Sequence, residues 1–515
     1  MPIKTKLRPA SEFGFRAPSA HSQHAAGRTQ FRASVHKPLH VMKFGGTSVG
    51  DASRIERVAE IVSNTARECH LIVVVSAMSG VTNKLMEAAA HSEAGNSALV
   101  AAVFRNLRAQ HEQVADALIS TAPERNEIGQ RMRRLFHEGE YLCQAAILTK
   151  EVTPQTRDSI ASLGERLSAP LIAAALARRG IKSEAIAATE LILTDANYGA
   201  ADPYMDATRE QCEARLRPLL YQGIIPVVTG FIGATIEGVL TTLGRGGSDY
   251  SATILGAALD ADEVIIWTDV DGVLTADPRL VPEARTIAEL SYHEAADLAH
   301  FGAKVLHPKT LQPVMQSKIP VRIRNSFAPE QLGTRIRPAE TTHRSEVCAI
   351  TTINEAQLVT VGGSRTSEVR NALGRASAAV SAVRADAWLT AHTASRHQIL
   401  VAVNPALAAQ VAKALREEFA EEFAEEKLEA VNVEATIAIV TLVGQALNNT
   451  SDFRERAVAS LQRTQIEVIA VGEEFSGRNL SLVVAQHQVD EALVVLHQEF
   501  RLGQPDPQAV PVKIL

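Results

Sequence analysis

The chain has 515 residues, 46% of them hydrophobic, and a formal net charge of -6. A chain of this length is more than one compact core normally needs, so we expect two or three domains. The weakly negative charge excludes a global basic field of the kind that favours nucleic acid, so any phosphate site has to be built locally.

Cysteine usage and apolar runs restrict the class further. The four cysteines lie far apart without CxxC or Cys/His ligand spacing, so we expect neither a disulfide framework nor a structural zinc site, and we assign no metal ligands. The longest apolar runs, such as residues 71–77, are strand-sized and fall short of the roughly 20 residues that a membrane helix needs. A soluble, cytoplasmic protein with no membrane segment is expected.

Residues 1–39 differ from the rest of the chain. They hold seven Lys and Arg residues against a single acid, Glu12, and an arginine-rich, acid-poor segment resembles an organellar transit peptide. The simpler interpretation is a disordered tail or an upstream start codon, because the segment has no sustained amphipathic period. In either case it lies outside the fold, and only a transit peptide would place the protein in a plastid or another organelle.

From residue 40 the pattern is that of a parallel sheet covered by helices. Residues 40–44 and 71–76 are strand patterns, and residues 51–68 between them have apolar side chains at helical spacing, so the first unit is βαβ. Residues 83–148 predict two or three helices with a break near Pro123. Strand patterns return at residues 224–231, 239–243, 264–267 and 321–324. We expect one α/β domain over residues 40–338.

After a linker at residues 337–345, the chain changes to short strands and helices. Two small βαββαβ-like units over residues 345–515 are the natural interpretation. The predicted strands are residues 345–353, 357–361, 398–403, 436–443, 467–471 and 480–484, and the predicted helices are residues 368–383, 406 onward, 452–462 and 489–500.

The most informative segment joins the first strand to the first helix and reads Lys43-Phe44-Gly45-Gly46-Thr47-Ser48-Val49. Its lysine precedes the glycines, whereas in the P-loop the lysine follows them. The physics is shared, because glycines let backbone N–H groups approach phosphate oxygens and a helix N-terminus favours anions. Taken alone, the glycines fit an ordinary tight turn equally well.

Two further polar segments follow strands. Residues 243–251 contain Arg245, whose planar fork suits a carboxylate, and Asp249, which suits a cation or a lysine. A helix N-cap made by Ser248 or Asp249 is the alternative. Residues 267–279 follow a buried strand at the carboxyl edge of the sheet, where open α/β sheets bind ligands, although their spacing alone predicts a turn with Asx-type hydrogen bonds.

Together these three segments resemble the aspartokinase family of the amino-acid kinase superfamily. Residues 76–83 (SAMSGVTN), 162–168 (SLGERLS), 194–199 (TDANYG) and 301–308 (FGAKVLHP) reinforce the resemblance, which extends from residue 40 to the C-terminus. It implies an α/β fold: a three-layer α/β/α sandwich around a mostly parallel sheet, followed by two α+β ACT modules. It also implies transfer of the γ-phosphoryl of ATP to the side-chain carboxylate of L-aspartate, with Mg²⁺ as cofactor. The product would be 4-phospho-L-aspartate, and the reaction would be the first step of lysine, threonine and methionine biosynthesis.

For phosphoryl transfer, the resemblance implies roles for the first two motifs. Lys43 would bridge the β- and γ-phosphates of ATP, and the amides of Gly45 and Gly46 would support the phosphoryl oxygens. Asp249 would hold Lys43 in place or help to organise the magnesium shell.

For the acceptor, the resemblance implies that Arg245 clamps the α-carboxylate of aspartate and that Glu165 pairs with its α-ammonium. Ser48, Thr82 and Ser248 would complete the substrate site. The acceptor carboxylate has a pKa near 4 and is already ionised at neutral pH, so it needs no general base. The enzyme's task is then to position two anions and neutralise their repulsion.

For the nucleotide, Thr268, Asp269, Arg279 and Lys304 match family positions around adenosine and the phosphates. Leu274 departs from the pattern, because the family commonly has an aromatic residue there that packs on the nucleotide. We therefore expect a base pocket at Leu274 that lacks this stacking contact.

The ACT pair implies a lysine or threonine effector and a homodimer or higher homo-oligomer formed through these modules. The loops at residues 445–453 and 362–367 lack the glycine pattern that normally brings backbone amides to an effector, so feedback inhibition is left open while a structural or dimerising role is expected. No dinucleotide fingerprint follows the ACT region, so we expect a monofunctional kinase without a fused homoserine dehydrogenase.

Two alternatives remain. A glutamate, acetylglutamate or nucleotide kinase of the same fold is disfavoured by residues 162–168 and by the ACT pair. A catalytically silent amino-acid-binding regulator would be expected to lack Lys43, Arg245, Glu165 or Asp249, and all four are present.

Overall fold

The computed structural model describes residues 37–303, 306–338, 347–363, 369–393, 398–444, 452–473 and 478–504. The predicted nucleotide-binding residue Lys304 lies outside these ranges. So do residues 1–36 of the N-terminal segment, and residues 364–368 and 445–451, which hold most of the two loops from which effector binding was judged.

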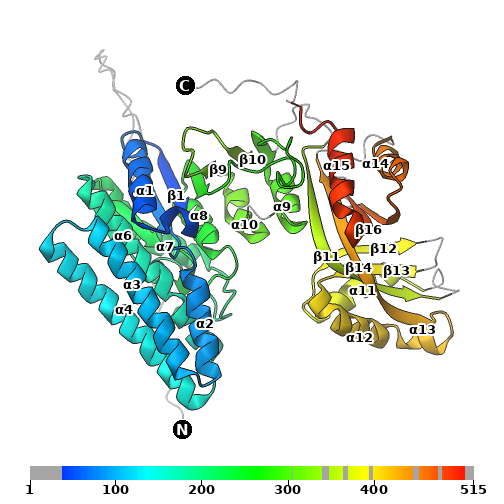
Figure 1. Cartoon of the computed structure of the whole chain (residues 1–515), viewed down its shortest axis with the longest axis horizontal. Coiled ribbons are helices and arrows are strands. Elements are labelled where there is room, and N and C mark those ends of the chain that lie inside the picture. The colour runs from blue at the N-terminus through cyan, green and yellow to red at the C-terminus, as the bar shows by residue number, and fades with distance from the viewer. Residues whose placement is uncertain are drawn as a thin grey trace, which may run out of the picture. The chain divides into compact units, whose positions relative to one another are not determined.

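An eight-stranded sheet forms the centre of the first domain (Figure 1). Its neighbouring strands run parallel except for the antiparallel pair β9 and β10. In spatial order the strands are β3 (Ser183–Ile186), β4 (Ile225–Thr229), β2 (His70–Val75), β1 (Leu39–Phe44), β7 (Glu263–Thr268), β9 (Val321–Asn325), β10 (Thr334–Arg337) and β8 (Glu289–Ser291). A separate hairpin pairs β5 (Ile232–Ala234) with β6 (Leu240–Thr242).

Helices cover both faces of this sheet, because successive side chains of a strand point to opposite faces. In β1, Met42 and Phe44 pack into one hydrophobic cluster and Val41 packs into another. The first cluster includes side chains of α1 (Ala52–Thr65), α2 (Val81–Glu93), α3 (Ser97–Leu118), α4 (Ala122–Thr149), α5 (Pro154–Ala161) and α6 (Leu163–Arg178). The second includes α7 (Met205–Tyr221), α8 (Gly247–Ala258), α9 (Tyr292–His300) and α10 (Pro308–Ser317). The predicted three-layer sandwich is confirmed.

The second domain is built on one six-stranded antiparallel sheet. Its strands are β12 (Ala387–Thr393), β13 (Gln398–Val403), β11 (Ala349–Gly362), β14 (Ala430–Val443), β16 (Asn479–Ala485) and β15 (Val468–Glu473) in spatial order. Its helices are α11 (Ala372–Ala382), α12 (Ala408–Glu418), α13 (Ala420–Ala424), α14 (Asp452–Arg463) and α15 (Val489–Glu499). The first three belong to one half and the last two to the other, which confirms the two predicted α+β ACT modules.

The two modules share their central strands. The segments predicted as separate strands at residues 345–353 and 357–361 form one strand, β11, which pairs along its length with β14. The polar residues Asn354 and Glu355 lie between the two predicted strands. They are instead absorbed by a register shift between Ile353 and Ala356, because a β-bulge lets an extra residue bend a strand without ending it.

The start of β11 is hydrogen-bonded to the first domain. Ile350 N donates to the carbonyl oxygen of Thr275 at 2.8 Å, and the Thr351 hydroxyl donates to the carbonyl oxygen of Phe301 at 3.2 Å. From α15, His497 lies 3.1 Å from the Thr275 hydroxyl. The chain that follows β7 is therefore in direct contact with the ACT region.

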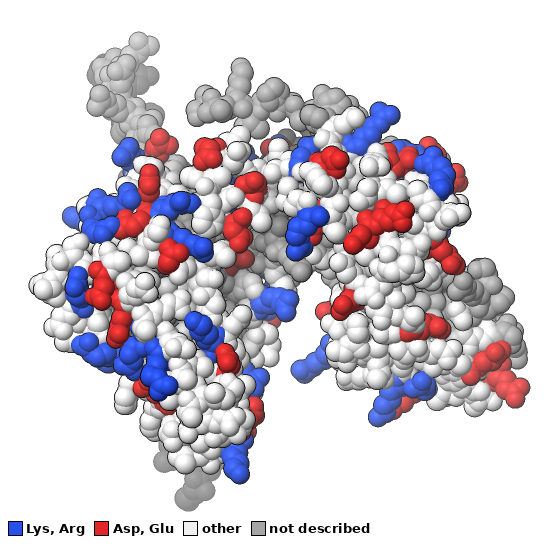
Figure 2. All heavy atoms as spheres, viewed as in Figure 1, with Lys and Arg blue, Asp and Glu red and all other residues white. Residues whose placement is uncertain are grey.

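Charges on the surface are mixed in sign. Figure 2 shows acidic and basic side chains interspersed over the face drawn, without a large field of one sign. Among the described residues, one helical stretch, Pro154–Arg178, is long and apolar enough to cross a membrane by length and composition, but 83% of its most apolar part is buried inside the protein. Burial of this kind is typical of a core helix.

Candidate active site

The chain segments after β1, β7 and β9 meet at the carboxyl edge of the central sheet, as parallel strands dictate. Gly45 N donates to the carbonyl oxygen of Trp267 at 3.1 Å, and Ser326 N donates to that of Thr268 at 2.9 Å. The Ser48 hydroxyl lies 2.8 Å from the Ser326 hydroxyl and is 2% exposed. Ser48, predicted to contact the substrate, thus holds two of these segments together and does not line the cavity above them.

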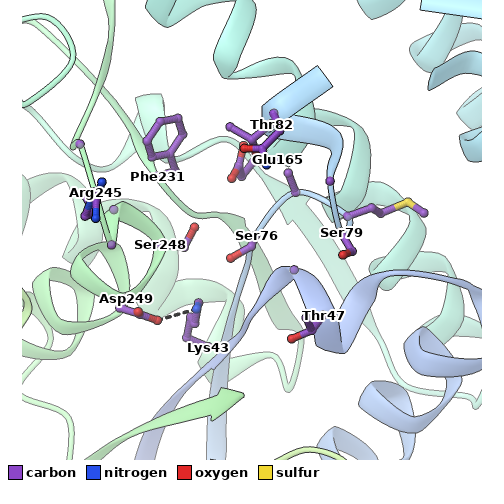
Figure 3. A pocket seen from close by; sticks show the side chains of 18 residues that line it. Lys43, Thr47, Ser76, Ser79, Thr82, Glu165, Phe231, Arg245, Ser248 and Asp249 are labelled. Atoms are coloured by element: carbon purple, nitrogen blue, oxygen red, sulfur yellow. Dashed lines mark ion pairs between the residues drawn. The ribbon is translucent and has the colours of Figure 1, made fainter. Parts of the chain in front are cut away.

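A cavity of about 450 Å³ opens at this edge. It is lined from β1, from the loop between β2 and α2, from the first turn of α6, and from the loop between β6 and α8. Seven residues predicted from the sequence come together here: Lys43, Gly46, Thr82, Glu165, Arg245, Ser248 and Asp249. Figure 3 shows Arg245, Ser248 and Asp249 on one side of the cavity and Thr82 with Glu165 on the other.

Lys43 and Asp249 form an ion pair at the floor of the cavity. Lys43 Nζ lies 2.5 Å from Asp249 Oδ1, and Lys43 is 8% exposed. Lys43 stands at the end of β1, whereas Asp249 belongs to the first turn of α8. An ammonium group has three donors, so one carboxylate fixes its position and leaves donor capacity for an anion in the cavity.

Glu165 is buried and only partly satisfied. It is 3% exposed, and among the described residues its Oε2 has no hydrogen-bond partner. Burial raises the pKa of Glu165 to about 8, an effect that the backbone N–H groups of Ala77 and of Glu165 itself and the charge of Lys43 only partly offset. An unpaired buried carboxylate next to a cavity is a binding position for a cation.

Arg245 is presented by a turn made of glycines. Gly244 and Gly246 have φ values of 81° and 70°, which only glycine adopts without strain, and Arg245 between them is exposed. The alternative role of Ser248 or Asp249 as helix N-cap does not occur, because the N-cap of α8 is Gly246 and no side chain caps it. Both side chains line the cavity instead.

The glycine turn after β1 runs close to the segment after β2. A Cβ at Gly46 would lie 2.9 Å from the carbonyl oxygen of Ala77, closer than real Cβ contacts allow. Gly45 precedes the short 3-10 helix η1 (Gly46–Val49) and is its N-cap. The glycines are therefore needed for a close backbone approach at the cavity wall.

Four further residues that were predicted to contact the nucleotide do not line this cavity. Leu274 and Arg279 line a second cavity of about 640 Å³, which also includes Gly302, Ala303 and, from β12, Trp388. Arg279 folds back onto its own loop and pairs with Asp277 at 2.5 Å. Thr268 is the last residue of β7 and Asp269 follows it at the sheet edge; both line neither of the two cavities.

Sequence reasoning missed Phe231, which lines the first cavity. Its φ of 70° is rare for a bulky residue, and such strain persists only where neighbours enforce it. Here Phe231 N donates to the Ser251 hydroxyl at 2.9 Å, and Leu243 N donates to the Phe231 carbonyl oxygen at 2.9 Å. A Cβ at Gly247 would lie 2.6 Å from the Phe231 ring. The glycine at position 247 was therefore the signal in the sequence that a bulky side chain packs closely against this turn.

A mostly parallel sheet with a buried lysine, glycine turns and a cavity lined by charged groups at its carboxyl edge is typical of α/β enzymes that bind small anions. A family model described as the amino acid kinase family matches residues 38–325, and one described as an ACT domain matches residues 440–500.

Among curated proteins, Aspartokinase 1, chloroplastic, of Arabidopsis thaliana is 31% identical over 468 residues, covering 89% of this chain and 80% of that protein. The bifunctional aspartokinase/homoserine dehydrogenase, chloroplastic, of Daucus carota is 32% identical over 489 residues. The alignment covers 91% of this chain and 52% of that relative, so the chain spans about half the length of the bifunctional relatives it matches.

Among solved structures, E. coli aspartokinase III in complex with aspartate and ADP matches with a TM-score of 0.74 and 28% identity. The match covers 90% of this chain and 99% of that one. The chain therefore belongs to the amino acid kinase family, within its aspartokinase branch.

Proposed function

We propose that this chain transfers the γ-phosphoryl group of ATP to the side-chain carboxylate of L-aspartate, giving 4-phospho-L-aspartate. The observation that carries the proposal is the pairing of charges in one cavity. Glu165, buried with an unpartnered oxygen, faces a cavity that also holds Arg245 and the ammonium group of Lys43. An α-amino acid carries an ammonium and a carboxylate, which fit Glu165 and Arg245 respectively.

The acceptor end of aspartate then lies toward Lys43. Its carboxylate is the nucleophile as it stands, so the side chains have to neutralise charge rather than remove a proton. Lys43, held by Asp249 at 2.5 Å, supplies that charge without having to move. Thr82 and Ser248, which line the cavity, complete the polar surroundings of the amino acid.

The triphosphate fits the edge of the sheet beside Lys43. The close approach of Gly46 to Ala77 leaves room for backbone rather than for a side chain, and Gly45 and Gly46 are proposed to support the phosphate oxygens. Thr268, Asp269 and Arg279 would contact the nucleotide, with the base near Leu274, and Lys304 keeps its expected role as a prediction.

Magnesium would be carried mainly by the nucleotide. The described ranges contain no group of three or more His, Cys, Asp or Glu side chains that could hold a metal ion. Mg²⁺ commonly binds through substrate phosphates, several waters and one or two carboxylates. Asp249 is the carboxylate beside Lys43 that would serve, and when bound the ion would offset charge on the transferred group.

The test is ADP release from Mg-ATP, measured with L-aspartate and separately with L-glutamate. Aspartate-dependent turnover that exceeds the glutamate rate is expected. The Arg245→Ala variant, which lacks the proposed clamp for the α-carboxylate, should raise KM for aspartate more than KM for ATP. A folded wild-type protein that turns over neither substrate would favour the silent regulator instead.

We further infer that the ACT modules bind an amino-acid effector and pair with a second copy of the chain. E. coli aspartokinase III, 28% identical with a TM-score of 0.71, has been solved in complex with lysine and aspartate in a T-state. Lysine and threonine, titrated separately into the turnover assay, test this inference. Inhibition by either one supports it, and an unchanged rate with both opposes it.

A further inference from the structure

A carboxylate outside the cavity joins the two sides of the proposed aspartate site. Asp158, on α5, is 3% exposed. Its Oδ2 accepts hydrogen bonds from Thr242 N at 2.8 Å and from Gly199 N at 3.0 Å, and its Oδ1 accepts one from the Thr242 hydroxyl at 2.9 Å. Three donors thus converge on one side chain that lies 84 residues from Thr242 in the sequence.

These bonds fix the base of the turn that presents Arg245. Thr242 is the last residue of β6, and the turn Gly244 to Gly246 follows directly. On the other side of that turn, a Cβ at Gly244 would lie 3.0 Å from the Gly199 carbonyl oxygen. Asp158 therefore binds both the end of β6, which leads into the Arg245 turn, and the segment at Gly199, against which that turn packs.

The backbone of Asp158 leads directly to the helix that carries Glu165. Ser162 N donates to the Asp158 carbonyl oxygen at 2.9 Å, so α5 continues almost directly into α6, which carries Glu165 in its first turn. The Ser168 hydroxyl, one turn on, donates to the Ser76 carbonyl oxygen at 2.7 Å and anchors α6 to the segment after β2. Because α6 has this anchor of its own, we expect the Asp158 side chain to fix the position of the Arg245 turn relative to α6 rather than the position of Glu165.

We infer that Asp158 is a positioning residue that sets the spacing between Arg245 and Glu165, and so the fit of the amino acid between them. The inference rests on the proposed function for its substrate. An apolar residue such as leucine would leave the Thr242 and Gly199 N–H groups without this acceptor. An asparagine would keep one oxygen for these two N–H groups and turn its NH₂ toward the Thr242 hydroxyl, which can accept a hydrogen bond, so leucine is the informative replacement. Burial also raises the pKa of Asp158, which its three hydrogen bonds partly oppose, so the carboxylate is kept at a cost that packing alone does not explain.

The experiment compares Asp158→Leu with the wild type in steady-state kinetics and in amide hydrogen exchange of residues 240–247. We expect KM for aspartate to rise about 10- to 100-fold, as misplacement of a substrate clamp does, while KM for ATP changes less than about twofold. Exchange over residues 240–247 should be faster than in the wild type. Thr242→Val, which removes one of the three bonds and keeps the residue's shape, should act in the same direction with a smaller effect, and the double variant should be less than additive.

Glu263→Gln is the matched control. Glu263 is also a buried carboxylate, 9% exposed and 3.0 Å from Arg322, but it lies at the first residue of β7, at the opposite edge of the sheet. Its replacement should lower the melting temperature without changing the ratio of the two KM values. If Asp158→Leu also lowers only the melting temperature, the side chain is merely structural and the inference is overturned.

Hydrogen exchange separates this inference from the proposed function. Should the wild type show no turnover with aspartate, the proposed function fails. Faster exchange confined to residues 240–247 in Asp158→Leu would then still support the positioning of the Arg245 turn. Unchanged exchange there would overturn the inference whatever the substrate proves to be.

Discussion

Replacing Glu165 by glutamine tests the charge logic of the cavity. Because the pKa of Glu165 is raised to about 8, about nine tenths of the empty enzyme carries a proton on this side chain at pH 7. An ammonium group bound at Glu165 favours the ionised form. Aspartate binding at pH 7 should therefore release about 0.9 proton, and the apparent affinity should follow the ionised fraction of Glu165.

The size of the effect follows from that fraction. The ionised fraction of Glu165 rises about ninefold between pH 6 and pH 7, about fivefold more up to pH 8, and then levels off. KM for aspartate should fall by these factors, while KM for ATP should not follow them. In Glu165→Gln the dependence on pH should disappear, and at pH 8 KM for aspartate should be about 10- to 100-fold above that of the wild type, because a charge-assisted hydrogen bond is lost.

Calorimetry of aspartate binding in two buffers of different ionisation enthalpy counts the released protons directly. Glu263→Gln, remote from the cavity, should release the same number as the wild type. Succinate, which lacks the ammonium group, should leave Glu165 protonated and bind no better as the pH rises. A wild-type KM that stays flat from pH 6 to pH 8, or proton release that survives in Glu165→Gln, would refute the reasoning.

The raised pKa also has a consequence for stability. A carboxyl group whose folded-state pKa lies above its unfolded value favours the folded state at low pH, and that contribution is lost as pH rises from about 4.5 to about 8. Near pH 8 the empty Glu165→Gln protein should therefore melt higher than the wild type, a difference that vanishes below pH 4.5 and that thermal melts at both pH values check. Lys43→Gln should reduce turnover about 1,000-fold, with Lys84→Gln, outside the cavity, as control in the ADP-release assay. Leu274→Tyr should lower KM for ATP several-fold and leave KM for aspartate unchanged if the base lies at this position, whereas an unchanged KM for ATP would locate it elsewhere. Phe231→Ala should lower the preference for aspartate over glutamate about 10- to 100-fold in kcat/KM, since it removes a wall against one extra methylene.

The first domain could be predicted because its signals are local. A β-branched run, a glycine turn and a helical period follow one another from residue 39 to residue 75, and each is enforced by burial on a definite face of the sheet. β3 was not predicted, because its four residues form an edge strand with three half-buried side chains and no hydrophobic pattern. β11 was divided in two, because a bulge does not show in the pattern of one strand taken alone.

Seven residues that line the cavity could be predicted from the sequence, but the way they are arranged could not. Spacing alone left each glycine segment as a turn, and family resemblance supplied the roles. Neither could indicate that the Ser48 hydroxyl is engaged by Ser326, 278 residues away. Nor could they indicate that Asp158 is hydrogen-bonded to the base of the Arg245 turn, because nothing in the local sequence around a polar helical residue identifies a partner that is distant in the chain.

The arrangement would let a chain of net charge -6 hold the two proposed anionic substrates at once. The charge that matters is local: Lys43, Arg245 and Asp249 line the same cavity, and Glu165 is kept neutral by burial until a cation arrives. With Glu165 protonated, these four groups carry a net charge of about +1, which favours entry of an anionic amino acid. Ionisation of Glu165 on binding of the proposed substrate would cancel that charge and hold the ammonium group in place. Binding would thereby replace the general electrostatic attraction of the cavity by one specific contact between Glu165 and the ammonium group. The free energy needed to ionise Glu165 falls as the pH approaches 8.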